Sequence, residues 1–279
     1  MEVHLLDGTY ELFRQHYGQA RHGTLRPGSA AAGVLATAIS LLERGATHLG
    51  VASDHVIESF RNDLWPGYKT SAGMPPEILD AIPVLESALT DLGVPCWAMV
   101  EQEADDALAA AAAVAGADPR VGRVLIGTPD KDLAQCVRGT RVVQFDGRRH
   151  LVIDEDAVHA KFGVGPASIP DYLALVGDAA DGFPGLPGWG ARSAAAVLAR
   201  YRHVEDVPAD HADWDVPGLR NAATLAATLR ERAEHARLFK DLATLRLDAP
   251  VGDVDGWRWR GPTPAFAATA ARLGAPRLA

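Results

Sequence analysis

Short apolar runs that end in acidic residues alternate with helical patterns along the first half of this chain. VHLLD ends at Asp7, HLGVASD ends at Asp54, and RVLIGTPDKD carries Asp130 and Asp132 just beyond its apolar part. Such short continuous apolar runs are typical of buried strands. Patterns with helical periodicity separate them, at residues 29–42, 76–92 and from 104 onward. This alternation predicts an α/β fold with a doubly wound, mostly parallel sheet.

The acids at the strand ends are expected to lie close together. In open α/β sheets, ligands bind along the edge where the carboxyl ends of the strands lie. Two carboxylates about 4 Å apart repel by roughly 4 kcal/mol at an effective dielectric of about 20. Crowded acids therefore need protonation or a bound cation. Oxygen ligands without His or Cys suit Mg²⁺ or Mn²⁺. With the EADD stretch, the candidate metal ligands are Asp7, Asp54, Glu103, Asp105, Asp106, Asp130 and Asp132.

This set holds more carboxylate than one ion needs, whereas two ions about 4 Å apart would use it. A two-metal carboxylate site hydrolyses phosphodiesters, with one ion activating water and the other stabilising the leaving oxygen. EADD in isolation has a second explanation, because acids in the first turn of a helix are favoured by about 0.3–1 kcal/mol each. Within EADD, Glu103 and Asp106 are expected to point to the same metal cluster. Asp105 is the alternative candidate for a direct bond to a metal ion.

One other catalytic motif can be tested at the first strand. Asp7-Gly8-Thr9 is similar to part of the DxDGT signature of aspartate-nucleophile phosphatases. The nucleophile of that signature would fall at position 5, where this chain has Leu5. We therefore reject a phosphatase of this type.

Composition limits the remaining classes. A chain of 279 residues that is 48% hydrophobic can bury a sizeable core, in one large domain or two smaller ones. The N-terminus has no secretory pattern, and no apolar run approaches the ~18 residues that span a membrane. Cys96 and Cys136 have neither metal-ligand spacing nor a disulfide pattern, so a cytoplasmic location is expected. The net charge of −9 argues against a protein that coats nucleic acid nonspecifically.

The second half of the chain is mainly helical and holds a further acidic pair and a glycine-rich turn. In VGDAADGFPGLPGWGARSAAAVLARY, Asp178 and Asp181 are three residues apart. Gly185, Gly188 and Gly190 precede a helix that starts near Ala191. A glycine-lined turn into a helix N-terminus offers backbone N–H groups to a phosphate. A packing corner without a ligand would show the same glycine spacing.

Five motifs in order resemble the 5′-to-3′ exonuclease/flap endonuclease family, which includes the N-terminal nuclease domain of bacterial DNA polymerase I. The motifs are LLDGTYELFR, DHVIESFRNDLWPGYK, EADDAL, TPDKDLAQCV and GDAADGFPGLPGWGARSA. They run along nearly the whole chain. The resemblance implies a PIN-like nuclease core at residues 1–165, with a short arch at about 55–100. It also implies a helical, helix-three-turn-helix DNA-binding domain at 166–279.

The resemblance also implies roles for single residues. Asp178 and Asp181 would join the acids above in holding two or more divalent ions. Arg61 and Lys69 would contact the scissile phosphate, with Arg14 as a weaker candidate. DNA downstream of the cut would be bound by a loop that includes Gly185, Gly188, Gly190, Arg192 and Ser193, and a K⁺ ion is also expected at this loop. The implied substrate is DNA with a free 5′ end, at a flap, nick or gap, in bacterial replication and repair. We expect a free-standing, monomeric nuclease at the nucleoid.

The chain departs from the family pattern at several positions. Ala72 replaces a basic residue after the YK pair, and the arch segment is acidic, which puts threading of long flaps in doubt. Pro129 stands where the family has Gly or Ala. Gly182 replaces the family's Asn, and Arg192 stands where a Lys is common. Two alternatives remain open: a DNA-binding protein of this fold that has lost catalysis, and a ribonuclease of the related PIN-like architecture. Ribonucleases of that kind are shorter and lack the glycine-loop module.

Overall fold

The computed structural model describes residues 1–147, 149 and 151–279. Its strands form one six-stranded sheet in the order β3-β2-β1-β4-β5-β6. All neighbouring strands are parallel except β5 and β6, which are antiparallel. The strand bounds are β1 (Glu2–Asp7), β2 (His48–Asp54), β3 (Cys96–Met99), β4 (Arg123–Gly127), β5 (Val142–Asp146) and β6 (Leu151–Ile153). The predicted α/β class and mostly parallel sheet are confirmed.

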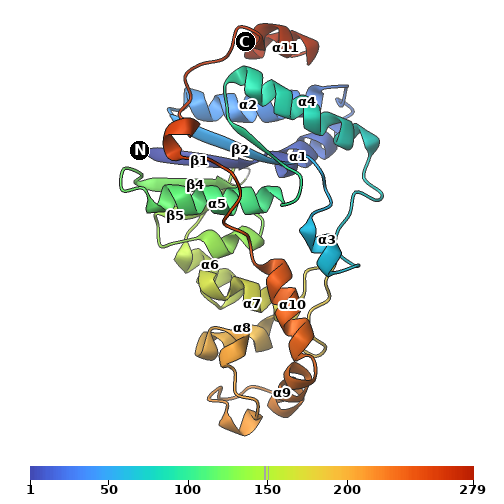
Figure 1. The fold of residues 1–279 in the computed structure, drawn as a ribbon, viewed down its shortest axis with the longest axis vertical. Helices are drawn as coiled ribbons and strands as arrows, with labels where there is room; N and C mark the ends of the chain where they lie inside the picture. The colour runs from blue at the N-terminus through green and yellow to red at the C-terminus, as the bar shows by residue number, and fades with distance from the viewer. Residues whose placement is uncertain (148, 150) are drawn as a thin grey trace.

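Helices cover both faces of the sheet and then continue into a helical region below it (Figure 1). The helices of the α/β part are α1 (Gly8–Arg21), α2 (Ser29–Glu43), α3 (Phe60–Leu64), α4 (Pro76–Leu92), α5 (Ala104–Ala117) and α6 (Glu155–Phe162). Those that follow are α7 (Ile169–Val176), α8 (Ala191–Tyr201), α9 (Ala222–Glu231), α10 (Ala233–Ala243) and α11 (Phe266–Arg272). Two short 3-10 helices matter below, η1 (Asp132–Cys136) and η2 (Pro166–Ser168). In the part of the chain that the structure describes, no helix combines the length and apolarity needed to cross a membrane.

Alternate residues of the strands enter two separate cores, as expected for strands buried on both faces. Val3 and Leu5 of β1 pack in one core with α5, whose small side chains are almost all buried. Leu6 packs in the other core with α2 and α4. The alanines of α5 allow close approach to the sheet, so the acids at its N-terminus are carried by a tightly held helix.

The arch is smaller than the sequence predicted. Residues 76–99 of the expected arch belong to the α/β core, because α4 packs its apolar face against α2 and β3 completes one edge of the sheet. The buried side chains of α4 include Ile78, Ile82, Leu85 and Leu89, which recur with helical spacing. The connection from β2 to α4, residues 55–75, therefore remains as the part outside the sheet.

The C-terminal segment returns to the α/β core, which corrects the prediction of one helical domain at 166–279. Leu245, Val251, Val254 and Trp257 are buried in the same core as α5. Trp257 is 1% exposed and meets Trp97 of β3 edge-on, with ring centroids 5.4 Å apart. Figure 1 shows this segment running back past the sheet to α11, which packs against α4. Irregular segments of this kind lack a periodic pattern, so their destination cannot be inferred from sequence.

Candidate metal centre

The ends of β1 and β2 place two acids beside each other, as predicted. Asp7 caps α1, because its Oδ1 accepts a hydrogen bond from Tyr10 N at 2.8 Å. Asp54 Oδ1 accepts one from Ala104 N, the first residue of α5, also at 2.8 Å. The two strands pair in parallel with Asp7 opposite Ala52, so both carboxylates lie at the same edge of the sheet.

The EADD stretch begins α5 at this edge, and its acids have different partners. Glu103 is 3% exposed and accepts hydrogen bonds from the hydroxyls of Ser59, at 2.7 Å, and Tyr68, at 3.3 Å. Its second oxygen also pairs with Lys69 Nζ at 2.8 Å. Burial alone would raise the pKa of Glu103, but the charges of Lys69 and Arg61 hold it below its ordinary value. Glu103 is therefore held as an anion by protein groups.

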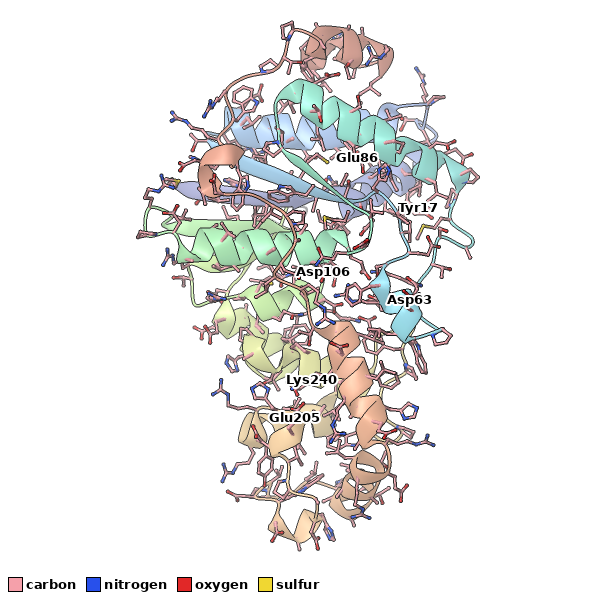
Figure 2. The ribbon with its side chains drawn as sticks, in the orientation of Figure 1. Tyr17, Asp63, Glu86, Asp106, Glu205 and Lys240 are labelled. Atoms are coloured by element: carbon pink, nitrogen blue, oxygen red, sulfur yellow. The ribbon has the colours of Figure 1, made fainter. Side chains whose placement is uncertain are left out.

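Asp106 is fully buried, and Figure 2 places it at the end of α5 that faces the helical region. It is 0% exposed and forms a two-point ion pair with Arg61, with both nitrogen–oxygen distances 2.8 Å. The backbone N–H groups of Glu103 and Arg246 also donate to it, at 3.0 and 2.7 Å. All of its strong acceptor positions are thus occupied, so the expectation that Asp106 shares a metal with Glu103 does not fit this geometry.

Arg61 is correspondingly unavailable to a phosphate in this structure. Its side chain is 1% exposed, and besides Asp106 it contacts Glu103 Oε1 at 3.2 Å. Its Nε donates to Leu242 O at 2.8 Å, and Nη2 donates to Thr244 O at 3.3 Å. The guanidinium therefore joins α3 and α5 to the end of α10. The predicted phosphate contact by Arg61 does not fit these contacts.

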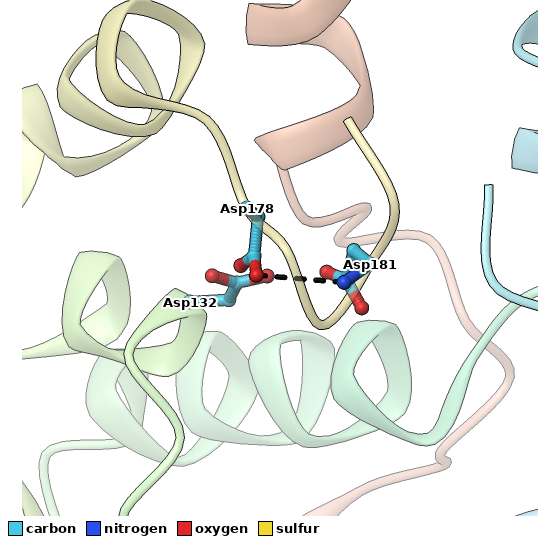
Figure 3. Close-up of side chains that lie close together, drawn as sticks. All are labelled: Asp132, Asp178 and Asp181. Carbon is cyan, nitrogen blue, oxygen red and sulfur yellow. Dashed lines mark hydrogen bonds between the residues drawn. The ribbon is translucent and has the colours of Figure 1, made fainter. Parts of the chain in front are cut away.

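Three aspartates from two segments meet in a buried cluster (Figure 3). Asp132, Asp178 and Asp181 each offer a carboxylate oxygen, and these oxygens lie within 4.8 Å of one another. Asp132 begins η1, whereas the other two lie in the loop between α7 and α8. Asp132 Oδ1 is buried and has no hydrogen-bond partner among the described residues. A buried acceptor without a donor is costly, and a cation would satisfy it.

A second acidic group adjoins this cluster. Burial, together with the charges of Asp54 and Asp130, raises the pKa of Asp7 to about 7. Desolvation, followed by the charges of Asp130 and Asp7, raises the pKa of Asp105 well above its ordinary value. Burial and the charge of Asp130 do the same for Asp132. Asp130 thus raises the pKa of acids in both groups. The carboxylates of the two groups repel one another, and a divalent cation would relieve this repulsion. They are Asp7, Asp54, Asp105, Asp130, Asp132, Asp178 and Asp181.

Two lysines lie against these acids. Lys69 bridges Glu103 and Asp181, with Nζ–oxygen distances of 2.8 and 3.0 Å. Its backbone N–H also donates to Asp181 O at 3.0 Å. Lys131 Nζ pairs with Asp178 Oδ2 at 2.7 Å. The side chains of Lys69 and Lys131 are 29% and 35% exposed, so both can reach solvent and a ligand.

Lys131 was not singled out from the sequence, although it is the central residue of the DKD motif. The hydroxyl donors Ser59 and Tyr68 were also missed, because nothing in their local pattern distinguishes them from surface residues. Only the fold brings them to Glu103.

Gly182 explains one departure from the family motif. The loop that carries Asp178 and Asp181 lies directly against the segment that carries Lys69. Trp65 Nε1 donates to Gly182 O at 3.0 Å. A β-carbon at Gly182, where φ is 84°, would lie 2.0 Å from Gly67 O. An asparagine side chain has no room there, so glycine is required by this close contact.

The remaining predicted residues lie outside the acidic groups. Arg14 on α1 pairs with Glu11 through Nε at 3.0 Å, and its charge is largely compensated there. In the glycine turn, Gly185 packs against the backbone of Gly177, whereas a β-carbon at Gly188 or Gly190 would meet no atom within 4 Å. Ser193 Oγ exchanges hydrogen bonds with the backbone of Gly190 at 3.0 Å. These contacts shape the turn before α8 and leave its outer side open.

A parallel sheet with clustered carboxylates at its carboxyl edge, followed by a helical region with a glycine turn, defines a metal-dependent nuclease class. Residues 2–163 match the family model described as 5′-3′ exonuclease, N-terminal resolvase-like domain. Residues 164–265 match the model described as 5′-3′ exonuclease, C-terminal SAM fold. The chain belongs to the 5′-3′ exonuclease family, and the prediction of this family is confirmed.

Curated relatives agree with this assignment. DNA polymerase I of Pseudomonas aeruginosa is 34% identical over 265 residues, covering 90% of this chain and 28% of that protein. The chain thus spans less than a third of that polymerase. The 5′-3′ exonuclease of Buchnera aphidicola subsp. Baizongia pistaciae is 30% identical over 251 residues, covering 88% of this chain and 82% of that protein.

Solved structures share the fold. The T5 D15 protein co-crystallised with metal ions matches with a TM-score of 0.70 and 17% identity, covering 98% of this chain and 97% of that one. The catalytic core of Rad2 in complex with DNA substrate matches with a TM-score of 0.62 and 14% identity, covering 97% and 86%.

Proposed function

We propose that this chain is a divalent-metal-dependent 5′ nuclease that hydrolyses DNA phosphodiesters at 5′ flaps, nicks or recessed 5′ ends. The observation that carries the proposal is the buried triad of Asp132, Asp178 and Asp181, with its unpaired Asp132 Oδ1. Membership of the 5′-3′ exonuclease family supports the reaction class. The T5 flap endonuclease, solved as a pseudo-enzyme-product complex with DNA and metal ions, has this fold and supports DNA as the substrate.

The donor set fits Mg²⁺ or Mn²⁺, because it consists of carboxylate oxygens. One ion would be held by Asp132, Asp178 and Asp181, and another by Asp7, Asp105 and Asp130. Such ions supply Lewis-acid stabilisation of the phosphoryl oxygens and activation of water. Glu103, both of whose oxygens are engaged by protein donors, would act from a more distant position.

We assign Arg61 and Asp106 a positioning role in place of their predicted roles. Arg61 holds Glu103 and Asp106 together, and Glu103 in turn holds Lys69. Lys69 and Lys131 are the basic groups that remain accessible at the acids, so they would contact the scissile phosphate and offset its charge in the transition state. The contact of Arg14 with phosphate stays a prediction.

The helical region would bind the duplex. The open side of the turn at Gly188 and Gly190 supports backbone contact with phosphates, and Arg192 and Ser193 follow it at the start of α8. We keep K⁺ at this turn as a prediction. The two free cysteines, Cys96 and Cys136, support a reducing, cytoplasmic setting.

The test is a cleavage assay on 5′-labelled flap and nicked duplexes with Mg²⁺ or Mn²⁺, resolved by product length. We expect cleavage by the wild type, and loss of cleavage with retained DNA binding in Asp130→Ala and Asp132→Ala. A wild-type protein that binds the flap but never cuts it would instead support a branched-DNA-binding protein without catalysis.

A further inference from the structure

A polar groove of about 700 Å³ lies where the α/β core meets the helical region. Its walls are the turn at Arg138 before β5, the last turn of α6 with the connection to η2, and the C-terminal end of α8. We call it the junction groove. The acids of the metal centre are not among its lining residues.

Two arginines line the junction groove, and neither is neutralised. Arg138 and Arg202 are both exposed, and within the described ranges neither side chain has a hydrogen bond or an ion pair. Glu155 is the acid among the lining residues, and its Oε2 already accepts a hydrogen bond from Gly139 N at 2.8 Å. The groove therefore has an excess of positive charge in a protein whose net charge is −9.

Arg202 is held in a backbone conformation that residues other than glycine rarely adopt. Its φ of 66° and ψ of −49°, with a hydrogen bond of 2.8 Å from His203 N to Tyr201 O, form a γ-turn with positive φ. Such strain persists only where surrounding contacts impose it, and it is concentrated at binding sites. The groove lies at this strained turn.

The contacts that impose the turn come from a buried acid on α7. Asp171 is 0% exposed and accepts a hydrogen bond from Val204 N at 2.9 Å, and its other oxygen contacts His203 Nδ1 at 2.9 Å. Lys240 of α10 pairs with both Asp171, at 2.8 Å, and Glu205, at 2.7 Å, and Figure 2 shows Lys240 and Glu205 side by side. The residues after Arg202 are thus fixed, and the guanidinium projects from a rigid turn.

A polar side chain without a partner lies in the same groove. Ser168 is 4% exposed and lines the groove, and its hydroxyl has no hydrogen-bond partner in the described part of the chain. His159 is held nearby, since a β-carbon added at Gly165 would lie 3.1 Å from His159 Nε2. The hydroxyl oxygen is not among the buried polar atoms left without a partner, so it opens to the groove and can donate a hydrogen bond to a ligand there.

We propose that the junction groove binds a phosphate group, namely a backbone phosphodiester of the DNA substrate. Guanidinium groups bind phosphate through paired N–H donors, and serine hydroxyls add a further donor. This deepens the proposed function, because the groove would hold duplex DNA at a second position away from the acids. The phosphate of a free mononucleotide has the same chemistry, and the experiment separates the two sources.

The test measures DNA binding without cleavage, by fluorescence anisotropy of a nicked duplex in EDTA over a series of salt concentrations. The variants are Ser168→Ala and the double variant Arg138→Gln/Arg202→Gly, in which glycine suits the positive φ. Arg200→Gln is the matched control, because Arg200 lies on the same turn of α8 but pairs with Asp215 at 3.0 Å outside the groove. Urea unfolding checks that each variant remains folded.

We expect the double variant to bind the duplex about tenfold more weakly. For the double variant, the logarithm of the association constant for DNA should fall less steeply with the logarithm of the salt concentration. The slope should be shallower by about 0.9 for each phosphate that the groove no longer neutralises. Ser168→Ala should weaken binding less, and Arg200→Gln should keep the wild-type slope. An unchanged affinity and slope in the double variant would overturn the proposal.

Titration with deoxyadenosine monophosphate separates the two phosphate sources. If the mononucleotide raises the melting temperature of the wild type but not of the double variant, while DNA binding is equal in both, the groove binds free nucleotide and the DNA proposal is wrong. The cleavage assay is independent of these readouts. A wild type that never cuts DNA would refute the proposed function. A salt slope that depends on Arg138 and Arg202 would still support phosphate binding in the groove.

Discussion

The guanidinium of Arg61 and the carboxylate of Asp106 face each other in a two-point ion pair, with side chains 1% and 0% exposed. Arg61 also binds the backbone oxygens of Leu242 and Thr244 at the end of α10. One buried pair therefore connects the β2–α4 segment, the helix that carries the EADD acids, and the end of the helical region.

Breaking the pair should destabilise the protein strongly. In Asp106→Asn the buried Arg61 charge loses its counter-charge, which typically costs about 3–5 kcal/mol. Urea unfolding with EDTA measures the change in the free energy of unfolding. Asp132→Asn is the matched control, because it removes a buried acid that lacks a cationic partner, and it should stabilise the metal-free protein. An equal loss of unfolding free energy in Asp106→Asn and Asp132→Asn would contradict the conclusion that Asp106 neutralises the buried Arg61.

The pair should act on catalysis as a unit. If Arg61 positions Glu103 and Lys69, then Arg61→Lys and Asp106→Glu should each lower kcat by on the order of 10²-fold while the KM for DNA stays similar. The double variant should be no worse than the worse single variant, because both changes disrupt the same interaction. Additive losses, or a rise in KM confined to Arg61→Lys, would show that Arg61 touches the phosphate independently.

Without metal, the protein should become less stable as the pH rises. The folded-state pKa values of Asp7, about 7, and of Asp105 and Asp132 lie above their ordinary values. Between pH 4 and about 7 the folded state therefore binds more protons than the unfolded state, and stability falls as the pH rises through this window. Each unit by which a folded-state pKa exceeds the unfolded-state pKa lowers the free energy of unfolding above that pKa by about 1.4 kcal/mol.

Urea unfolding in EDTA at several pH values measures this slope. Asp7→Asn should flatten it, and Mn²⁺ should raise the melting temperature most at the upper end of the window. Stability that rises with pH in EDTA would contradict the crowding of these carboxylates.

The contact at Gly182 should be intolerant of any side chain. Gly182→Ala places a β-carbon against Gly67 O and should separate Asp181 from Lys69. Gly218→Ala is the control, because Gly218 has a similar φ of 78° but no atom within 4 Å of the added carbon. We expect the control to lose about 1 kcal/mol from backbone strain. Gly182→Ala should lose more and should cut DNA more slowly at saturating metal.

The returning C-terminal segment should contribute to the α/β core. Trp257→Ala removes a fully buried side chain beside Trp97 and should cost about 3–5 kcal/mol in urea unfolding. Trp214 in the helical region is half-buried, so Trp214→Ala should cost less than half as much. A similar cost for both would mean that Trp257 does not pack in the core of the protein in solution.

Much of the fold could be predicted because its signals are local. The strands β1, β2 and β4 were visible as apolar runs, and α2, α4 and α5 begin where the helical patterns begin. Parallel strands end at one edge, so the meeting of Asp7 with Asp54 followed from the class of sheet alone. The EADD capping role also survives, since Asp106 accepts a hydrogen bond from Glu103 N.

The sequence by itself thus determined the α/β class, the family and the acids from which a metal centre would be built. Only the tertiary structure separated Asp105 from Asp106, because successive helical residues point in different directions and Arg61 arrives from a distant segment. Tertiary packing also decided the glycine at 182 and the return of residues 245–257 to the sheet. Both depend on contacts between segments far apart in the chain, and such contacts leave no periodic pattern in the sequence.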